Sequence, residues 1–202
     1  TNVLGEAAPL LKKMGNKAFI VTGRHVAVSD MMKQLTALLD ENGIGCVIFD
    51  GITGEPTDTM IENGVEMLKS SGCDFIIGIG GGSPLDSAKA IAAMAVNEGS
   101  IADYNGKEIT GEILPLAAIP TTAGTGSEAT KFTVITDSEK GIKMLLKGDV
   151  LVPKLAIVDS SFTVGAPKSV TSATGLDALT HAVEAYTSRK AFSMTDTLAV
   201  SA

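Results

Sequence analysis

An aspartate and a histidine stand four residues apart in the run TGLDALTHAVEAY, which has the composition of a helix. Residues at i and i+4 share one face of an α-helix, so the side chains of Asp177 and His181 can reach the same metal ion. A carboxylate oxygen and an imidazole nitrogen suit Fe²⁺, Zn²⁺ or Mn²⁺ rather than a thiolate-type site. The same spacing also fits an ordinary hydrogen-bonded helix pair, and two ligands alone do not complete a metal site.

A glycine triplet follows an apolar run and precedes a helical segment. Residues without Cβ at Gly80, Gly81 and Gly82 let the backbone approach a ligand closely, and Ser83 and Pro84 suit the N-cap and N1 positions of the next helix. Free N–H groups and the helix dipole at such a junction favour a phosphate. A tight turn that serves packing alone is the alternative. The turn is neither a GxGxxG fingerprint nor a P-loop.

A second polar turn, PTTAGTGS at 120–127, also leaves the end of an expected strand. Its hydroxyls and glycines could hold pyrophosphate or ribose oxygens from the side opposite the glycine triplet. An S/T/G-rich segment taken alone is more often an ordinary loop. Two such turns at neighbouring strand ends predict a cofactor cleft, because ligands of open α/β sheets bind at the carboxyl ends of the strands.

The hydrophobic pattern gives the elements that must position these turns. Short apolar runs rich in Val, Ile and Phe alternate with segments of helical period, which is typical of βα repeats. Ser29 and either Thr57 or Asp58 are candidate helix N-caps. The expected strands are 18–21, 47–49, 75–79 and 116–119. The expected helices are 30–41, 58–70 and a third that begins at Pro84 or Leu85 and ends at Val96.

The pattern changes after the fourth expected strand. Extended segments at 132–136, 143–146 and 156–158 indicate a strand-rich insert, and from Pro167 onward only helices are expected, at 173–187 and 193–202. We predict an α/β fold, with a Rossmann-like parallel-sheet domain at 1–165 and the beginning of an all-helical domain at 166–202. The last helix has no stop signal before Ala202, so we expect a truncated polypeptide.

Composition narrows the possible partners. The 202 residues carry a net charge of −7, which leaves no basic face for nucleic acid. No apolar run approaches the ~20 residues that cross a bilayer, and the N-terminal residues do not have the pattern of a signal peptide, so we expect no membrane partner and a cytoplasmic location. Cys46 and Cys73 lack metal-site spacing and are interpreted as reduced structural thiols.

Three motifs occur in one order: GGGSPLDSAKAIA, PTTAGTGSEAT and TGLDALTHAVEAY. Together they resemble the iron-containing, group III alcohol dehydrogenases, and the resemblance covers essentially the whole chain. It implies a dinucleotide-binding α/β domain, an all-helical domain, an active-site cleft between them, and a homodimer or higher homo-oligomer.

The resemblance also assigns site residues by motif match. Asp177 and His181 would be the first two ligands of Fe²⁺ or Zn²⁺, with two further histidines expected from later helices that this sequence lacks. No catalytic residue beyond the metal ligands is expected. The cofactor would be bound by Gly81, Gly82, Ser83 and Pro84 at the pyrophosphate, by Thr121, Thr122 and Thr130 along its length, by Lys143 at the ribose, and by a closing segment at 162–166 that includes Phe162 and Val164.

Two positions depart from the family pattern. Many NAD-using members carry an acidic residue that binds the adenosine ribose at the position of Gly23. With Gly23 followed by Arg24 and His25, a 2′-phosphate can be accommodated, so we expect NADP rather than NAD, although Arg24 could equally be a solvated surface charge. Glu55, in GEPT, replaces an asparagine that is common in the family.

The resemblance implies an oxidoreductase that transfers hydride between NAD(P)H and a short-chain aldehyde or primary alcohol. The metal would act as a Lewis acid on the substrate oxygen. The rival hypotheses are a glycerol-dehydrogenase-like or dehydroquinate-synthase-like enzyme on the same scaffold, and a cofactor-binding module without turnover. The last is what we expect of these 202 residues taken alone.

Overall fold

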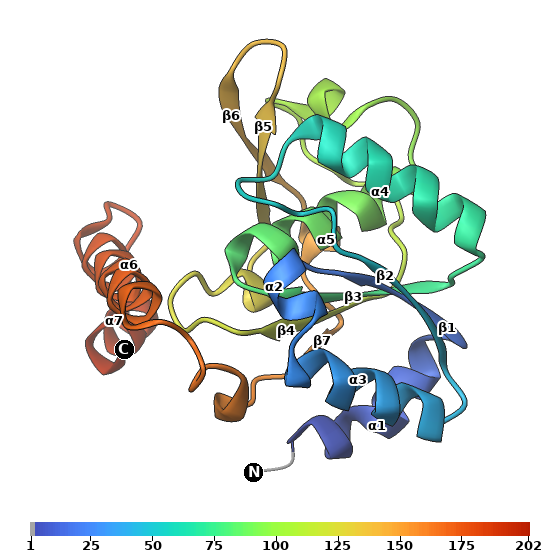
Figure 1. The fold of residues 1–202 in the computed structure, drawn as a ribbon. Helices are drawn as coiled ribbons and strands as arrows, with labels where there is room; N and C mark the ends of the chain where they lie inside the picture. Colours follow the sequence, from blue (N-terminus) through green and yellow to red (C-terminus); the bar gives the residue numbers. More distant parts are fainter. Residues whose placement is uncertain (1–2) are drawn as a thin grey trace.

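The computed structural model describes residues 3–202, and its centre is a five-stranded, wholly parallel sheet (Figure 1). The strand order is β2-β1-β3-β4-β7, so the chain reverses direction across the sheet between β1 and β3. A crevice at the carboxyl ends of the strands is expected at this switch point. The strands are β1 (Lys17–Val21), β2 (Gly45–Phe49), β3 (Phe75–Gly80), β4 (Leu116–Pro120) and β7 (Leu155–Ala156).

Helices cover both faces of the sheet (Figure 1). One core cluster joins α1 (Val3–Met14) and α3 (Asp30–Glu41) to one face, and a second joins α4 (Asp58–Ser71) and α5 (Gly82–Met94) to the other. Every residue of β3 is buried, as its uninterrupted apolar sequence predicts for a central parallel strand. The α/β, Rossmann-like fold class is confirmed.

Helix α5 is enclosed on nearly all sides and carries a continuous run of buried residues from Ser87 to Met94. The sheet approaches it closely at Gly78, where an added Cβ would stand 2.8 Å from the Cβ of Ala88. On the opposite side α4 approaches at Gly64, where an added Cβ would collide with Ile91. Small residues on both sides therefore hold α5 tightly between α4 and the sheet.

Local helix signals are confirmed where side chains cap the backbone. Ser29 accepts a hydrogen bond from the N–H of Met32, and Thr57 accepts one from the N–H of Met60. The expected start of α5 was wrong: Gly81 is its N-cap, so Ser83 and Pro84 lie inside the first turn. Proline is tolerated there because the first-turn N–H groups have no partner within the helix.

The strand-rich insert is a hairpin of β5 (Phe132–Asp137) and β6 (Ile142–Lys147), which forms a separate antiparallel sheet beside α5 (Figure 1). Side chains of β5 alternate between buried and exposed positions, as expected of a strand covered on one face. The third extended segment was expected at 156–158, but strand β7 covers only Leu155–Ala156. The chain stays beside β4 for one more residue, because the Ile157 N–H donates to the Ala118 carbonyl.

Two long C-terminal elements follow, α6 (Lys168–Thr187) and α7 (Ser193–Ser201). Helix α6 begins five residues before the expected start, directly after Pro167, whose fixed φ suits a helix N-cap.

Helix α1 and the short α2 (Arg24–Ala27) were not predicted. Within residues 3–202 no helix is long and apolar enough to span a membrane. The 3₁₀ turns are Ile101–Tyr104, Ser127–Ala129, Asp149–Leu151 and Ser160–Phe162.

Candidate cofactor and metal site

The two polar turns predicted to hold a cofactor lie against each other. Gly80 has φ +149°, a conformation that other residues rarely adopt, and this sends the chain from β3 directly into α5. A Cβ added at Gly81 would be 3.4 Å from the side chain of Thr122, and one at Gly82 would be 3.1 Å from that of Thr125. A side chain at Gly81 would be in ordinary contact with the second turn, whereas one at Gly82 would press against Thr125, so the two turns approach most closely at Gly82.

Thr122 carries a buried hydroxyl without a hydrogen-bond partner, one of two such buried side-chain atoms within the described residues. A buried polar atom left unpaired costs about 1–3 kcal/mol, so a ligand that satisfies it gains binding energy. The neighbouring Thr121 is buried, and its N–H donates to the carbonyl of Gly80 (2.9 Å). An orphaned hydroxyl beside a glycine turn at a helix N-terminus fits the phosphates of a dinucleotide.

Asp86 connects the glycine-turn helix to both neighbouring segments. Its Oδ1 accepts from the Ser127 hydroxyl (2.6 Å), and its Oδ2 accepts from the N–H of Val134 in β5 (2.9 Å). Burial raises the pKa of the Asp86 carboxyl, while these hydrogen bonds and the charge of Lys89 oppose that rise. The carboxylate therefore ties α5 both to the second turn and to the hairpin.

Lys89 lies one helical turn further and is fully buried. Its ammonium donates to the Thr130 carbonyl (2.8 Å), to the Thr130 hydroxyl (3.0 Å) and to the Phe132 carbonyl (2.8 Å). Burial lowers the pKa of Lys89 to about 8, although the charges of Asp86 and Glu128 act in the opposite direction. The buried ammonium of Lys89 thus fixes the position of Thr130, which was predicted to line the cofactor. The sequence reasoning did not identify Asp86 or Lys89.

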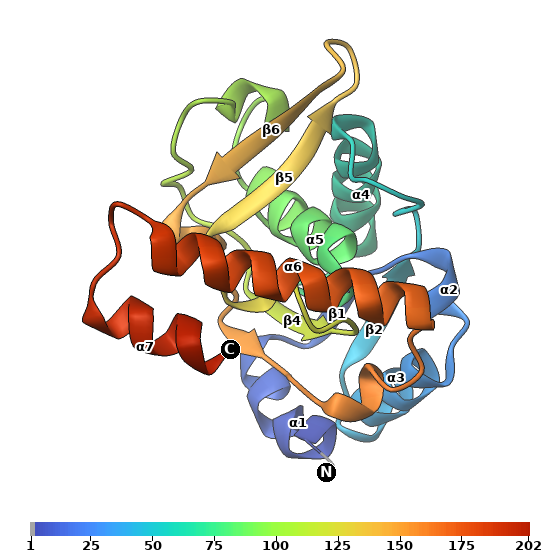
Figure 2. The same cartoon turned by 90° about the vertical axis from the view of Figure 1, so that its left-hand side faces the viewer.

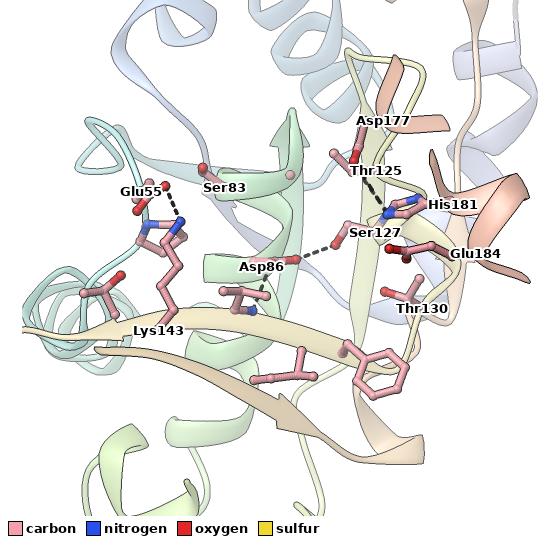
Figure 3. A pocket seen from close by; sticks show the side chains of 16 residues that line it. Glu55, Ser83, Asp86, Thr125, Ser127, Thr130, Lys143, Asp177, His181 and Glu184 are labelled. Carbon is pink, nitrogen blue, oxygen red and sulfur yellow. Dashed lines mark hydrogen bonds and ion pairs between the residues drawn. The ribbon is translucent and has the colours of Figure 1, made fainter. Parts of the chain in front are cut away.

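An open cleft of about 620 Å³ lies between the glycine turn, the hairpin and α6 (Figure 3). It brings together predicted residues from four separate regions of the chain. Figure 3 shows Ser83 and Lys143 on one side of this cleft and the side chains of α6 on the other. The predicted residues that line it are Gly82, Ser83, Thr130, Lys143, Asp177 and His181.

The predicted metal ligands face each other across one turn of α6. The Oδ1 of Asp177 lies 3.6 Å from the Nε2 of His181, and the two side chains are 41% and 53% exposed. Within residues 3–202 no three His, Cys, Asp or Glu side chains come together in a way that could hold a metal ion. Glu184 lines the same cleft one turn further without completing such a group. Oxygen and nitrogen donors at this spacing fit half of a site for Fe²⁺ or Zn²⁺.

Comparison with known proteins places this arrangement in a family. Residues 1–160 match the family described as iron-containing alcohol dehydrogenase, and residues 171–202 match the Fe-containing alcohol dehydrogenase family, C-terminal. The chain belongs to the iron-containing alcohol dehydrogenase family. The resemblance seen in the three motifs is therefore confirmed.

Curated relatives show both the similarity and its extent. The chain is 41% identical over 199 residues to the NAD-dependent methanol dehydrogenase of Bacillus methanolicus, covering 98% of this chain and 52% of that protein. It is 41% identical over 205 residues to the 1,3-propanediol dehydrogenase of Citrobacter freundii, covering 100% and 52%. The chain thus spans about half the length of the curated relatives it matches.

Solved structures in the family share the fold. A crystal structure of 1,3-propanediol oxidoreductase superposes with a TM-score of 0.91 at 39% identity, covering 98% of this chain and 51% of that one. An alcohol dehydrogenase from Oenococcus oeni superposes with a TM-score of 0.94 at 31% identity, covering 98% and 53%.

Glu55, one of the two departures from the family pattern, contacts a predicted cofactor residue. Its Oε1 lies 2.6 Å from the ammonium of Lys143, and the two side chains are 66% and 62% exposed. Figure 3 shows this ion pair at the wall of the cleft opposite α6. An acidic residue where the family often has asparagine therefore neutralises the lysine expected at the ribose.

Gly23, the other departure from the family pattern, lines a smaller cleft of about 340 Å³ with Arg24 and His25. Gly80 and Gly81 line the same cleft, so the region after β1 adjoins the phosphate turn. Gly23 is the N-cap of α2, and a Cβ there would be 3.0 Å from the carbonyl oxygen of Ile52. The residues predicted to discriminate between cofactors thus surround one space.

The two residues named in the segment expected to close over the cofactor lie in different environments. Phe162 is buried in the core cluster that contains α1 and α3, whereas Val164 is 82% exposed. Neither residue lines the two clefts described above. The side chains of Phe162 and Val164 therefore lie apart from the predicted cofactor residues that line these clefts.

Proposed function

We propose that the protein formed with this chain is an oxidoreductase that transfers hydride between a nicotinamide dinucleotide and a short-chain aldehyde or primary alcohol. The observation that carries this proposal is that the glycine turn and the Asp177–His181 pair line one cleft. Family membership supports the same reaction class, because relatives in the family are named methanol and 1,3-propanediol dehydrogenases.

The cofactor side is built from the two turns. Free N–H groups at the start of α5 would bind the pyrophosphate, and the unpaired Thr122 hydroxyl would donate to a phosphate oxygen. Pro84 lacks an N–H, so the donors come from the other residues of the turn, including Gly82 and Ser83. Lys143 would contact the ribose from the hairpin side of the cleft.

The metal side is Asp177 and His181. Two further histidines would complete the ligand set, and we place them in sequence aligned with the C-terminal halves of the relatives. When bound, Fe²⁺ or Zn²⁺ supplies Lewis acidity toward the substrate oxygen and the nicotinamide ring supplies or accepts hydride. The contribution of this chain is orientation, because it fixes the cofactor turn and half of the metal site on opposite walls of one cleft.

We further propose NADP(H) as the preferred cofactor. Gly23 supplies no carboxylate to repel a 2′-phosphate, and Arg24 and His25 line the adjoining cleft. We also retain as proposals a domain boundary between residues 165 and 166, a homodimer or higher homo-oligomer, and a cytoplasmic location.

The decisive experiment uses a protein that joins this chain to the segment aligned with the C-terminal half of its relatives. After anaerobic loading with Fe²⁺ or Zn²⁺, reduced-nicotinamide absorbance is followed with NADPH or NADH and a panel of short aldehydes. Metal-dependent oxidation is expected, with loss by at least ~10²-fold in Asp177→Ala and in His181→Ala. Lys190→Ala, on the exposed segment between α6 and α7, is the matched control and should keep full activity.

A second candidate function is nucleotide binding without turnover. It is favoured by the buried, unpaired hydroxyl of Thr122 beside the glycine turn, because this feature suits a phosphate and needs no metal. Bound nucleotide without oxidation of any aldehyde, despite bound metal, would support this candidate and reject the dehydrogenase.

A further inference from the structure

The second polar turn touches the metal-ligand helix at one glycine. A Cβ built at Gly124 would collide with the carbonyl oxygen of Thr174 in α6 and would lie 2.8 Å from the Cβ of Thr174. Gly124 does not have the left-handed backbone that distinguishes neighbouring Gly126 (φ +63°). The requirement for glycine at position 124 therefore comes from the approach of α6 and not from the conformation of the turn.

The turn side of this contact is firmly anchored. The Thr121 N–H donates to the carbonyl of Gly80, and the hydroxyl of buried Ser127 donates to Asp86 (2.6 Å). These bonds fix both ends of the turn to β3 and to α5. Gly124 lies between the two anchor points, so it has little freedom to retreat.

The α6 side is held much less firmly. No residue of α6 or α7 is buried, and α6 makes its main helix packing against α7 (Figure 2). The half-buried residues of its first turns recur at helical spacing, on the face that includes the Thr174 contact: Val170, Thr174, Asp177 and Ala178. Within residues 3–202 the turn is therefore better anchored than α6, and we expect α6 to move when these two surfaces are forced apart.

We propose that Gly124 is the positioning residue that sets the separation between the cofactor turn and the metal-ligand helix. Asp177 lies three residues beyond Thr174, so a displacement of α6 at Thr174 carries Asp177 and His181 with it. The inference rests on the proposed function for its consequence, because a misplacement of about 1 Å at a reacting centre can cost ~10²-fold in rate. Gly124 itself touches no reacting atom.

Crystal structures of Gly124→Ala and of the matched control Gly175→Ala test the geometry directly. Gly175 is adjacent to the contact on the same helix, and a Cβ there would meet nothing within 4 Å. In Gly124→Ala, α6 should move outward by about 1 Å, because ordinary C···O approach is about 3.3–3.6 Å. The turn and α5 should stay in place, and Gly175→Ala should leave α6 unmoved. An unmoved α6, or a turn that retreats in its place, would overturn the proposal.

Kinetics of the metal-loaded protein give a second readout. In Gly124→Ala we expect kcat to fall ~10–100-fold while the KM for the nicotinamide cofactor stays within about 2-fold, since only the metal side is displaced. A matching loss of cofactor affinity would contradict the proposal, because it would mean that the turn had moved. A wild-type protein without turnover would reject the proposed function, whereas the crystal structures would still decide the role of Gly124.

Discussion

The α/β part and the C-terminal helices of this chain differ sharply in how they are packed. In β3 every residue is buried, whereas in α6 and α7 none is. The cofactor turns belong to the first region, and Asp177 and His181 belong to the second. The proposed cofactor site lies on a buried core and the proposed metal pair lies on exposed helices, so the two should respond differently to mutation.

Exposed apolar side chains mark the second region as well. They lie along α6 and α7 and at the N-cap of α7. Burial of such surface, about 25 cal/mol per Å², is what stabilises a helix in a folded domain. As described, these helices contribute little to the stability of residues 3–202. The side chains concerned are Leu176, Leu179, Val183, Tyr186, Phe192, Met194, Leu198 and Val200.

The largest expected effect is a loss of stability on truncation of a core side chain in β3, compared with the same kind of truncation in α6. Ile77→Ala empties a fully buried position at the centre of β3 and should lower the free energy of unfolding by about 2–5 kcal/mol. Leu179→Ala, at a 59% exposed position in α6, should change it by less than about 0.5 kcal/mol. Urea denaturation followed by circular dichroism measures both. Equal losses would show that α6 shares the core of the α/β part.

A second change tests the buried cation beneath the cofactor turn. Lys89→Met leaves the carbonyls of Thr130 and Phe132 unpaired and should cost about 1–3 kcal/mol near pH 7, with weaker nucleotide binding. Lys33→Met removes the same charge from an exposed ion pair and should cost less than about 1 kcal/mol. Unfolding free energies and nucleotide titrations of both variants give the comparison. An undiminished stability of Lys89→Met would contradict the role of this lysine.

The pH dependence of stability follows from the same residue. The pKa of Lys89 is lowered to about 8 in the folded protein from 10.5, so the unfolded chain binds more protons between these values. The penalty for burying the charged ammonium is therefore fully present below about pH 8 and is relieved as the pH rises to 10.5, so the folded protein gains stability across this window. The difference in unfolding free energy between wild type and Lys89→Met should widen from pH 8 toward 10.5. A constant difference would show that Lys89 is not desolvated.

A third change concerns cofactor choice within the well-packed region. Gly23→Asp introduces a carboxylate beside Arg24 and should shift the ratio of NADPH to NADH affinity toward NADH by about tenfold or more. Gly54→Asp adds the same charge where a Cβ meets nothing within 4 Å, and it should leave the ratio unchanged. Fluorescence titration with each reduced nucleotide measures the ratio. An equal effect of both variants would point to net charge rather than to local contact.

The smallest expected effect concerns the exposed Glu55–Lys143 pair. Glu55→Gln frees the lysine ammonium and should strengthen nucleotide binding by roughly 2- to 5-fold, because exposed pairs contribute only about 0.2–1 kcal/mol. Glu62→Gln removes an equal charge from α4 and serves as the control. Weaker binding in Glu55→Gln would mean that Glu55 itself assists the cofactor.

Much of the α/β part could be predicted because its signals are local. Caps at Ser29 and Thr57 and the apolar run of β3 depend on neighbours in sequence, and these predictions are confirmed. Helix α1 was missed because Pro9 lies inside it, and an internal proline argues against a helix. The start of α5 was misplaced because serine and proline in its first turn imitate a helix N-terminus.

The site could be predicted only in part, because the remaining contacts are tertiary. The motifs name residues that do meet in one cleft, among them Ser83, Asp177 and His181. The burial of Lys89 depends on a hairpin more than 40 residues away, and the Glu55–Lys143 pair spans 88 positions. The residues next to Lys89, Glu55 and Lys143 in the sequence do not indicate these partners.

The tight enclosure of α5 has a consequence for the entropy of ligand binding. Gly78 and Gly64 let the sheet and α4 close on this helix at Leu85, Ala88 and Ile91, so the body of the helix behind its first turn is fixed before any ligand arrives. Ordering a flexible segment on binding costs about 1–2 kcal/mol per residue, and a preorganised turn avoids this cost. A phosphate reaching Gly81 and Gly82 would therefore meet donors that are already aligned.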